Sequence, residues 1–397
     1  NNQPFFSMIT YQTPHTPLQV PDVYFDKYKS KGVDDFNAAI YGMVENIDEN
    51  VGRIQDKIKT LNIEENTIFL YLSDNGPLNL RFNQGLKGRK GSVDQGGVRV
   101  PMIINWKGHI QENTKLNQPL AHIDILPTLL DLVDKDYEFE NEIDGLSFKG
   151  LLEQKSDPAF DERIIYQEWH GNKRAVQGDF LMVNEALFNL AKDPVQKTNV
   201  RDKNEAVYNE LNRHFQNWLV SVKRPNEGKK YIPVGYDDFP KAILPAHEAN
   251  LLPPFEFRKD RKHTGIAYHS LHGWAHDWID FWTETDAYAS WDIDIIEEGT
   301  FDVYIKYALE EENTKTKLVL TIDQQEIEIE NLPSFEHSTF QDHDRVKRTQ
   351  EAPETDWATT KIGSVKLKKG KKELSIKAVE IPGKKSIELK EILLLKT

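Results

Sequence analysis

The most constraining feature of this sequence is a long amphipathic stretch that runs directly into an apolar one. Residues 34–63 place an apolar side chain at every third or fourth position, which predicts one helix of about seven turns. Residues 67–73 are almost continuously apolar, as expected for a strand that is covered on both faces. A helix followed at once by a buried strand is typical of an α/β sheet. The apolar face of the helix consists of Phe36, Ile40, Met43, Ile47, Val51, Ile54, Ile58 and Leu61.

The remaining patterns divide the chain into four parts. Residues 1–155 carry the α/β pattern, including apolar runs at 4–12 and 100–106 that predict further strands and a helical pattern at 121–133. Residues 156–224 carry short strand patterns and a closing amphipathic helix, which predict a small α+β subdomain. Residues 225–254 are rich in Pro, Gly and charge and are predicted to be a linker. Residues 255–397 contain short alternating strands separated by Gly and Asp turns, which predict an all-β sandwich.

Composition excludes several classes of protein. The 64 acidic residues outnumber the 50 Lys and Arg residues and give a net charge of −14, which argues against general nucleic-acid binding. The chain has no cysteine, so disulfides, thiolate metal sites and a cysteine nucleophile in these 397 residues are excluded. No apolar run approaches the roughly 20 residues of a membrane span.

Asp74 and Asn75 stand where the predicted strand 67–73 ends. Ligands of open α/β sheets bind at the carboxyl ends of the strands, so both side chains are expected to face a ligand crevice. Carboxylate and amide oxygens suit Ca²⁺ or Mg²⁺ rather than zinc. Two such ligands are too few for either ion, so the others must come from elsewhere. The alternative interpretation is an ordinary Asp-Asn-Gly turn.

Lys90 and the Gly96–Gly97 pair follow in the next loop. The glycines predict a tight turn into the strand at 100–106, and Lys90 is a candidate cation for an anionic group held against the metal. The alternative is a solvated lysine in a common glycine loop, which is the interpretation we give to Lys87 and Arg89.

The order of these motifs resembles the type I sulfatases of the alkaline phosphatase superfamily. The resemblance rests on TYQTPHTPLQVP at 10–21, on the passage 41–76 that ends in SDNG, and on KGRKGSVDQGGVRVPMIINWKG at 87–108. It continues through AHIDILPTLLDLV, DGLSFKGLL and ALFNLAKDPVQKTNV, and so covers roughly residues 5–220 in six landmarks. It implies a sulfatase (alkaline-phosphatase-like) α/β sheet with helices on both faces.

The resemblance also implies a role for each candidate residue. Asp74 and Asn75 would ligate a divalent cation, Ca²⁺ before Mg²⁺. His15 and Lys90 would be catalytic and substrate-binding residues that contact the sulfate, with His15 close to the leaving-group oxygen. His170, in YQEWHGNKRAVQGDF at 166–180, would touch the sugar or other organic part of the substrate, or else be a packed structural histidine.

One part of the family pattern is not found. Type I sulfatases use a formylglycine made from the Cys or Ser of a C/S-x-P/A-x-R motif, and the nearest approach here, SDPAF at Ser156, lacks the arginine. The family places that motif and two further metal-binding aspartates earlier in the chain than residue 1. We therefore expect a missing N-terminal segment of the same protein to supply them, and the 397-residue chain to be inactive alone.

The C-terminal part resembles the galactose-binding-like β-sandwiches found among carbohydrate-binding modules. The passage FWTETDAYASWDIDIIEEGTFDVYIKYAL at 281–309 carries that resemblance. Five tryptophans offer a sugar-stacking face, although we expect Trp282 and Trp291 to pack in the core. A structural domain at the rim of the active site is the preferred interpretation. The five are Trp274, Trp278, Trp282, Trp291 and Trp357.

The two resemblances together imply a secreted or periplasmic bacterial sulfatase, or its C-terminal portion, that hydrolyses sulfate esters of a polysaccharide or oligosaccharide. Two alternatives stay open at this point: a phosphate or phosphonate monoester hydrolase of the same superfamily, and a non-catalytic protein that binds sulfated glycans.

Overall fold

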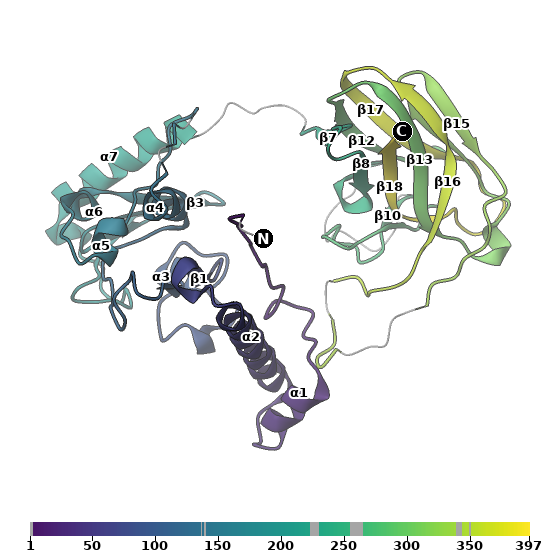
Figure 1. The fold of residues 1–397 in the computed structure, drawn as a ribbon. Coiled ribbons are helices and arrows are strands. Elements are labelled where there is room, and N and C mark those ends of the chain that lie inside the picture. Colours follow the sequence, from purple (N-terminus) through teal and green to yellow (C-terminus); the bar gives the residue numbers. More distant parts are fainter. Residues whose placement is uncertain are drawn as a thin grey trace. The chain divides into compact units, whose positions relative to one another are not determined.

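The computed structural model describes residues 3–135, 137–138, 140–222, 230–254, 265–338, 344–348 and 351–397 (Figure 1). The chain forms two compact units, one made of residues 1–52 with 227–397 and the other of residues 53–226.

The first half of the unit 53–226 contains a two-stranded sheet and short helices. β1 (Phe69–Leu72) pairs antiparallel with β2 (Met102–Asn105). All four residues of β1 are half-buried, and Ile103 of β2 is 62% exposed. The predicted strands exist, but the full covering expected for residues 67–73 is wrong, because a sheet of only two strands offers little surface for helices to cover. α2 (Asp35–Thr60) begins in the other unit and ends in this one. The remaining helices of this half are η1 (Glu64–Asn66), η2 (Leu80–Phe82), α3 (Gln95–Val98), η3 (His122–Asp124), α4 (Ile125–Leu132), α5 (Lys149–Leu152) and α6 (Pro158–Glu162).

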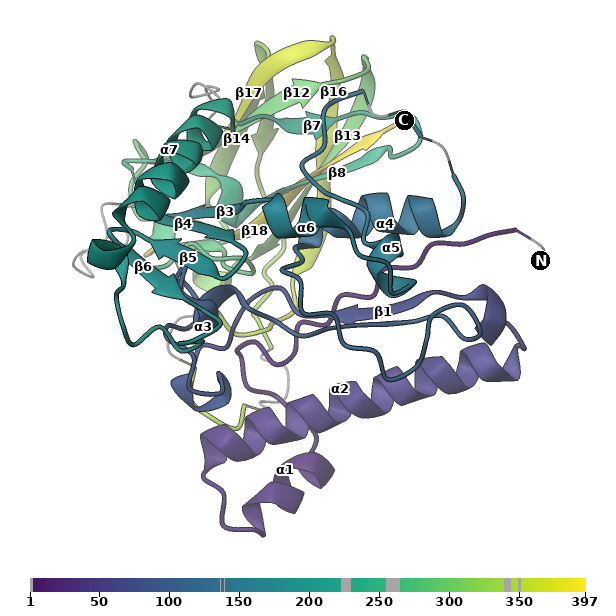
Figure 2. The same cartoon turned by 90° about the vertical axis from the view of Figure 1, so that its left-hand side faces the viewer.

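The second half of this unit is a four-stranded meander covered by a long helix, as Figure 2 shows. One face of the meander packs on Tyr208, Leu211 and Phe215 of the helix, and these side chains are at most 3% exposed. The other face packs on Val93, a residue of the loop that precedes α3. The predicted small α+β fold is therefore present, and one of its faces supports the loop that carries Lys90. The elements are β3 (Ile165–Trp169), β4 (Asn172–Gln177), β5 (Phe180–Val183), β6 (Ala186–Asn189), η4 (Arg201–Lys203) and α7 (Glu205–Val222).

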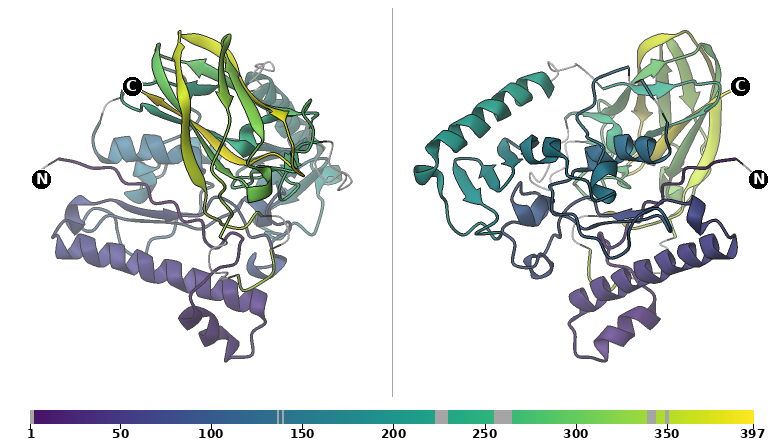
Figure 3. Two further views of the ribbon diagram at one scale, coloured as in Figure 1. Left: turned by 90° about the vertical axis from the view of Figure 1, so that its right-hand side faces the viewer. Right: turned by 60° about the vertical axis from the view of Figure 1, so that its left-hand side comes forward.

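Residues 230–397 form two six-stranded sheets, and the strands wind in two layers (Figure 3). One sheet has the order β10-β11-β18-β13-β16 with β8 paired to β18, and the other has the order β15-β14-β17-β12-β7 with β9 paired to β12. The strands are β7 (Ile232–Val234), β8 (Lys241–Pro245), β9 (Asn250–Leu252), β10 (Ala267–Tyr268), β11 (Ile279–Asp280), β12 (Tyr288–Ile295), β13 (Gly299–Ala308), β14 (Lys317–Ile322), β15 (Gln325–Ile329), β16 (Ala358–Leu367), β17 (Gly370–Glu380) and β18 (Glu388–Lys396), with η5 (Ala246–Glu248) and η6 (Glu311–Asn313) between them.

The core of this β-domain draws on both sheets. Trp291 and Ile293 of β12 meet Phe301 and Val303 of β13 in one cluster, and all four are 0% exposed. The apolar residues at alternate positions of β12 and β13 belong to this core, so the predicted β-sandwich is confirmed.

The predicted linker 225–254 is wrong over residues 230–254. β7 runs parallel to β12, β9 pairs antiparallel with β12, and β8 pairs with β18. These three strands have only three to five residues each, so their alternation is too short to stand out against the surrounding Pro, Gly and charge. Residues 225–229 and 255–264 of the predicted linker and sandwich lie outside the described residues.

The N-terminal residues of the same unit attach to a loop of the β-domain. Arg345 donates two hydrogen bonds to the carbonyl oxygen of Val20, at 3.0 and 2.7 Å, and Gln19 donates one to Asp344 at 2.8 Å. α1 (Asp22–Lys29) follows. Residues 4–12, predicted as a strand, form none, and Phe6 is 80% exposed; among the described residues they find no ladder partner, and an extended chain without one is not a strand.

Candidate functional site

The turn after β1 holds the two predicted metal ligands. The side chain of Asp74 accepts a hydrogen bond from the backbone N–H of Asn75 at 2.8 Å, and the amide of Asn75 donates to the carbonyl oxygen of Gly76 at 2.9 Å. Both residues follow the carboxyl end of β1, separated from it by Ser73, as the sequence predicts. The carboxylate of Asp74 is exposed and available to a ligand from solvent.

The loop with Lys90 is fastened to this turn by backbone hydrogen bonds. Gly76 N–H donates to the carbonyl oxygen of Gly97 at 2.8 Å, and Lys90 N–H donates to that of Pro77 at 2.9 Å. The contact is so close that a Cβ atom on Gly76 would lie 1.9 Å from the carbonyl oxygen of Gly96. The structure therefore brings Asp74, Asn75 and Lys90 onto two adjoining loops.

The predicted tight turn at Gly96–Gly97 is wrong in detail. The two glycines lie inside α3, a single helical turn, because Gly97 N–H bonds back to Asp94 at 2.9 Å. Both are required by close packing: a Cβ on Gly96 would lie 2.3 Å from the carbonyl oxygen of Gly88, and one on Gly97 would lie 2.1 Å from that of Ser92.

His122 is a further residue at this site that the sequence reading did not select. Its Nε2 donates a hydrogen bond to the carbonyl oxygen of Ser73 at 2.9 Å, directly beside Asp74. The sequence offers no signal for this contact, because His122 is 49 residues from Ser73 and stands in an ordinary helix start.

Asp124, the last residue of η3, holds this 3₁₀ turn in place. Its carboxylate is 0% exposed, accepts backbone hydrogen bonds from Ala121 and Leu146, and is bound by Arg163 at 2.9 Å through both oxygens. Four hydrogen bonds to one buried carboxylate fix the start of α4 and thereby the position of His122.

The other predicted site residues lie elsewhere. His15 is exposed in the loop before α1, and its Nδ1 donates a hydrogen bond to the backbone carbonyl oxygen of Thr16 at 2.7 Å. It belongs to the unit made of residues 1–52 and 227–397. His170 is exposed at the tip of the β3–β4 hairpin, with φ of 48° and its ring edge-on to Trp169. The packed interpretation of His170 is thus wrong. Its contact with substrate, like that of His15, stays a prediction.

The donor set at Asp74 and Asn75 fits a hard cation in type but not in number. Ca²⁺ takes six to eight oxygen ligands, and these two residues offer two side chains. In the described part of the chain, the one group of three His, Asp or Glu side chains with metal-ligand spacing is His269, Asp280 and Glu388 of the β-domain.

In that β-domain group, a lysine already binds the two carboxylates. Lys385 Nζ lies 3.1 Å from Asp280 and 2.6 Å from Glu388, so an ammonium group already stands between the two carboxylates. Burial alone would raise the pKa of Asp280, but its hydrogen bond from His269 and the charge of Lys385 hold it at about 2. We read the group as a buried ion network.

His337 extends this network and predicts a pH dependence of stability. Its Nδ1 donates to the carbonyl oxygen of Asp356 at 3.2 Å and its Nε2 faces Glu388 at 2.8 Å, which requires the doubly protonated ring. Burial lowers the pKa of His337 and Lys385 opposes its charge, but the hydrogen bonds to Glu388 and Asp356 outweigh both, so the pKa is raised.

The stability from His337 is therefore complete below the unfolded-state pKa of about 6.5 and is lost as pH rises through the higher folded-state pKa. His337→Gln should lower the free energy of unfolding of the β-domain by about 1–2 kcal/mol at pH 5.5 and by less at pH 9. Urea unfolding at both pH values measures this. An equal loss at the two values would contradict the assignment.

The tryptophans do not form the sugar-stacking face that the sequence suggested. Trp278, Trp282 and Trp291 are at most 2% exposed and belong to the core, as expected for the latter two. Trp357 packs against the same core, and only Trp274, at 38%, is among the exposed large side chains.

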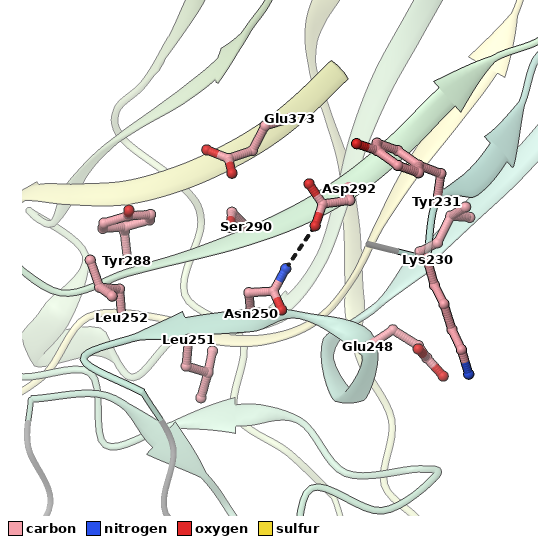
Figure 4. Close-up of a pocket in the computed structure, with 11 residues that line it drawn as sticks. Lys230, Tyr231, Glu248, Asn250, Leu251, Leu252, Tyr288, Ser290, Asp292 and Glu373 are labelled. Carbon is pink, nitrogen blue, oxygen red and sulfur yellow. Dashed lines mark hydrogen bonds between the residues drawn. The ribbon is translucent and has the colours of Figure 1, made fainter. Parts of the chain in front are cut away.

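A polar groove of about 410 Å³ lies instead on the β12 sheet (Figure 4). It follows the edge of β12, where β9 pairs with residues 288–290 and β7 with residues 293–295. Tyr288 and Tyr231 stand at its two ends, and Asp292, which accepts a hydrogen bond from Asn250 at 3.3 Å, stands between them. Three carboxylates line it against one lysine, which favours uncharged hydroxyl groups over sulfate. The lining carboxylates are those of Glu248, Asp292 and Glu373, and the lysine is Lys230.

Two family models match the chain. The model described as Sulfatase matches residues 1–135, and that described as N-sulphoglucosamine sulphohydrolase, C-terminal, matches residues 90–224.

Individual relatives agree with these matches. An arylsulfatase of Clostridium perfringens is 28% identical over 248 residues, which are 51% of this chain and 50% of that protein. An N-acetylgalactosamine-6-O-sulfatase of Bacteroides thetaiotaomicron is 25% identical over 255 residues, 56% of this chain and 47% of that protein. The chain spans about half the length of these relatives.

Among solved structures, that of Ps i-CgsB is 27% identical with a TM-score of 0.51, covering 54% of this chain and 50% of that one. The same protein in complex with k-i-k-neocarrahexaose gives 26% identity and a TM-score of 0.50 over 54% of this chain and 49% of that one. Among the described helices, none is both long and apolar enough to cross a membrane.

Proposed function

We propose that this chain, whose residues 1–224 belong to the sulfatase family, carries the sulfate-holding half of a hydrolase for sulfate esters. The observation that carries the proposal is the pair of backbone hydrogen bonds, Gly76 to Gly97 and Lys90 to Pro77, that join the loop of the oxygen ligands to the loop of the cation. An anion placed there meets a lysine on one side and a cation-binding turn on the other.

Each residue has a role in this scheme. Asp74 and Asn75 would hold Ca²⁺, or Mg²⁺ as the second choice, and the bound cation would polarise a sulfuryl oxygen. Lys90 neutralises another sulfate oxygen. His15 neutralises charge and donates a proton to the departing alcohol, and His170 contacts the organic part of the substrate.

The other half of the active centre is proposed to come from a segment before residue 1, which carries the formylglycine nucleophile and two further metal-binding aspartates. Two observations support this. The chain spans about half of each relative reported above. A cavity of about 1700 Å³ in the unit 53–226 is lined by apolar side chains such as Met102 and Phe148 and by charged ones such as Lys107 and Asp161, and its volume is large enough to hold a segment of chain.

The proposed substrate is a sulfated polysaccharide or oligosaccharide. The name of one relative specifies an N-acetylgalactosamine sulfate, and a solved relative was crystallised with a neocarrahexaose. A secreted or periplasmic location in a bacterium is part of the proposal, because it accords with a polysaccharide or oligosaccharide substrate. For the β-domain we propose a structural role first, with the groove of Figure 4 as the place to seek carbohydrate binding.

The test compares the hydrolysis of sulfated oligosaccharides by two proteins, measured as the release of sulfate. The product of the complete open reading frame should turn over, and the 397-residue chain alone should not. Release of phosphate from a matched phosphate ester at a higher kcat/KM would favour the monoester hydrolase. Binding of sulfated oligosaccharide by the complete protein without turnover would favour the non-catalytic binding protein.

A further inference from the structure

One arginine of the small subdomain grips the loop that carries Lys90. Arg174 of β4 donates from Nη2 to the side-chain oxygen of Gln95 at 2.9 Å and from Nη1 to the carbonyl oxygen of Val93 at 3.3 Å. Arg174 and Gln95 are each 5% exposed, so both side chains are almost fully buried, although they also line the cavity of the unit 53–226.

A second buried side chain completes the grip. Gln196, which is 3% exposed and has φ of 57°, accepts a hydrogen bond from the backbone N–H of Gln95 at 2.8 Å and donates to the carboxylate of Asp94 at 2.9 Å. Residues 93–95 are thus held at four points by two side chains of the subdomain.

This grip continues into the proposed site. Gln95 is the first residue of α3, and Gly97, two residues later, accepts the hydrogen bond from Gly76 beside Asn75. Five residues before Gln95, Lys90 is bound to Pro77. A displacement of Gln95 would therefore be passed to both the cation loop and the metal-ligand turn, because the glycine contacts leave no free space.

Burying the charged guanidinium group of Arg174 costs free energy. Burial lowers the pKa of Arg174 to about 10 against the opposing charge of Asp94, so the guanidinium stays charged at neutral pH. Its Nε has no hydrogen-bond partner among the described residues. A buried cation with an unmade hydrogen bond is usually less stable than an apolar side chain of the same size, so packing among the described residues does not by itself account for Arg174.

We propose that Arg174 is a positioning residue for sulfate binding. It holds the loop 86–98 so that the ammonium group of Lys90 and the oxygen ligands of Asp74 and Asn75 face the same anion. This inference rests on the proposed function and adds to it a residue that touches neither sulfate nor metal.

The first arm of the test uses the 397-residue chain itself. In Arg174→Met, amide hydrogen exchange of residues 76–98 should become at least about tenfold faster, because the loops lose their support. The matched control is Arg201→Met, which removes a guanidinium that bonds Glu185 at 3.0 Å and lies 3.9 Å over the Tyr208 ring, away from the loop. Unchanged exchange in Arg174→Met, or equal acceleration in the control, would overturn the proposal.

The second arm uses the product of the complete open reading frame. Arg174→Met should raise KM for the sulfated substrate at least about tenfold, with a smaller change in kcat. Arg174→Lys should raise KM less than Arg174→Met does. In a Lys90→Ala background the replacement by methionine should raise KM by a smaller factor than in the parent, because the part of its effect that passes through Lys90 is then already lost. A role in overall folding alone would give additive effects and no recovery by lysine.

The two arms separate the two proposals. If Arg174→Met exchanges faster but the complete protein does not turn over, the support of the loop by Arg174 is retained. The sulfatase function is then wrong, and with it the role of Arg174 in sulfate binding. Normal turnover with unchanged KM would retain the function and remove the role of Arg174.

Discussion

Lys90→Ala in the product of the complete open reading frame is expected to lower kcat/KM for sulfate-ester hydrolysis by about 10²–10³-fold. Lys90 stands in the loop that is bound to the turn of Asp74 and Asn75 through Gly76 and Pro77. Under the proposed function, removal of its ammonium group would leave charge on a sulfate oxygen uncompensated. Steady-state kinetics on one sulfated oligosaccharide measures the loss.

Lys87 is the matched control for this experiment. It lies three residues earlier in the same loop, but its ammonium group is 3.6 Å from Asp94 and 4.9 Å from the Phe188 ring centre. Lys87→Ala should keep kcat/KM within about threefold, as is usual for a partly exposed ion pair. A Lys90→Ala enzyme as active as Lys87→Ala would remove Lys90 from the site.

Arg163→Met is expected to destabilise the unit 53–226 by about 3–5 kcal/mol. Arg163 is the ionic partner of Asp124, and methionine fills similar volume while leaving that carboxylate buried and unpaired. Hydrogen exchange of α7 and β4 peptides across a urea series reports the stability of this unit separately from that of the β-domain.

Two variants control for this result. Lys155→Met breaks an exposed ion pair with Glu153 and should cost less than about 1 kcal/mol. Adding Asp124→Asn to Arg163→Met should recover part of the loss, because the buried charge is then gone. A single Arg163→Met that unfolds like the parent would show that the pair contributes little.

Local patterns predicted the parts of the site that neighbours in sequence determine. Asp74 and Asn75 follow a strand end, which a short apolar run marks, and Lys90 stands in a glycine loop of recognisable spacing. That these loops meet was predicted from the family resemblance, since nothing in the spacing of residues 74 and 90 requires it.

The supporting residues were not predictable in this way. Arg174, Gln196 and His122 act through one or two hydrogen bonds each, with residues 49 to 102 positions away. Such contacts leave no periodic pattern, because one side chain and one turn suffice to make them. The same reason explains the error at residues 230–254, where strands of three to five residues were too short to reveal their pairing.

The sequence predicted the architecture of the β-domain but not which residues lie on its surface. Alternation along β12 and β13 identifies the inward residues, so the core could be read from the sequence. Tryptophans are as suited to a core as to a sugar-binding face, and three of the five are in the core. The acidic groove depends on β7 and β9 joining the edge of β12, which the linker prediction had excluded.

The central claim is that these residues are one half of a sulfatase active centre, and the nucleotide sequence immediately before the codon for Asn1 tests it most directly. We expect an in-frame C/S-x-P/A-x-R motif preceded by an Asp-Asp pair, which would supply the nucleophile and the remaining metal ligands. A stop codon or an unrelated sequence at that place would contradict the account and favour the alternative of a non-catalytic protein that binds sulfated glycans.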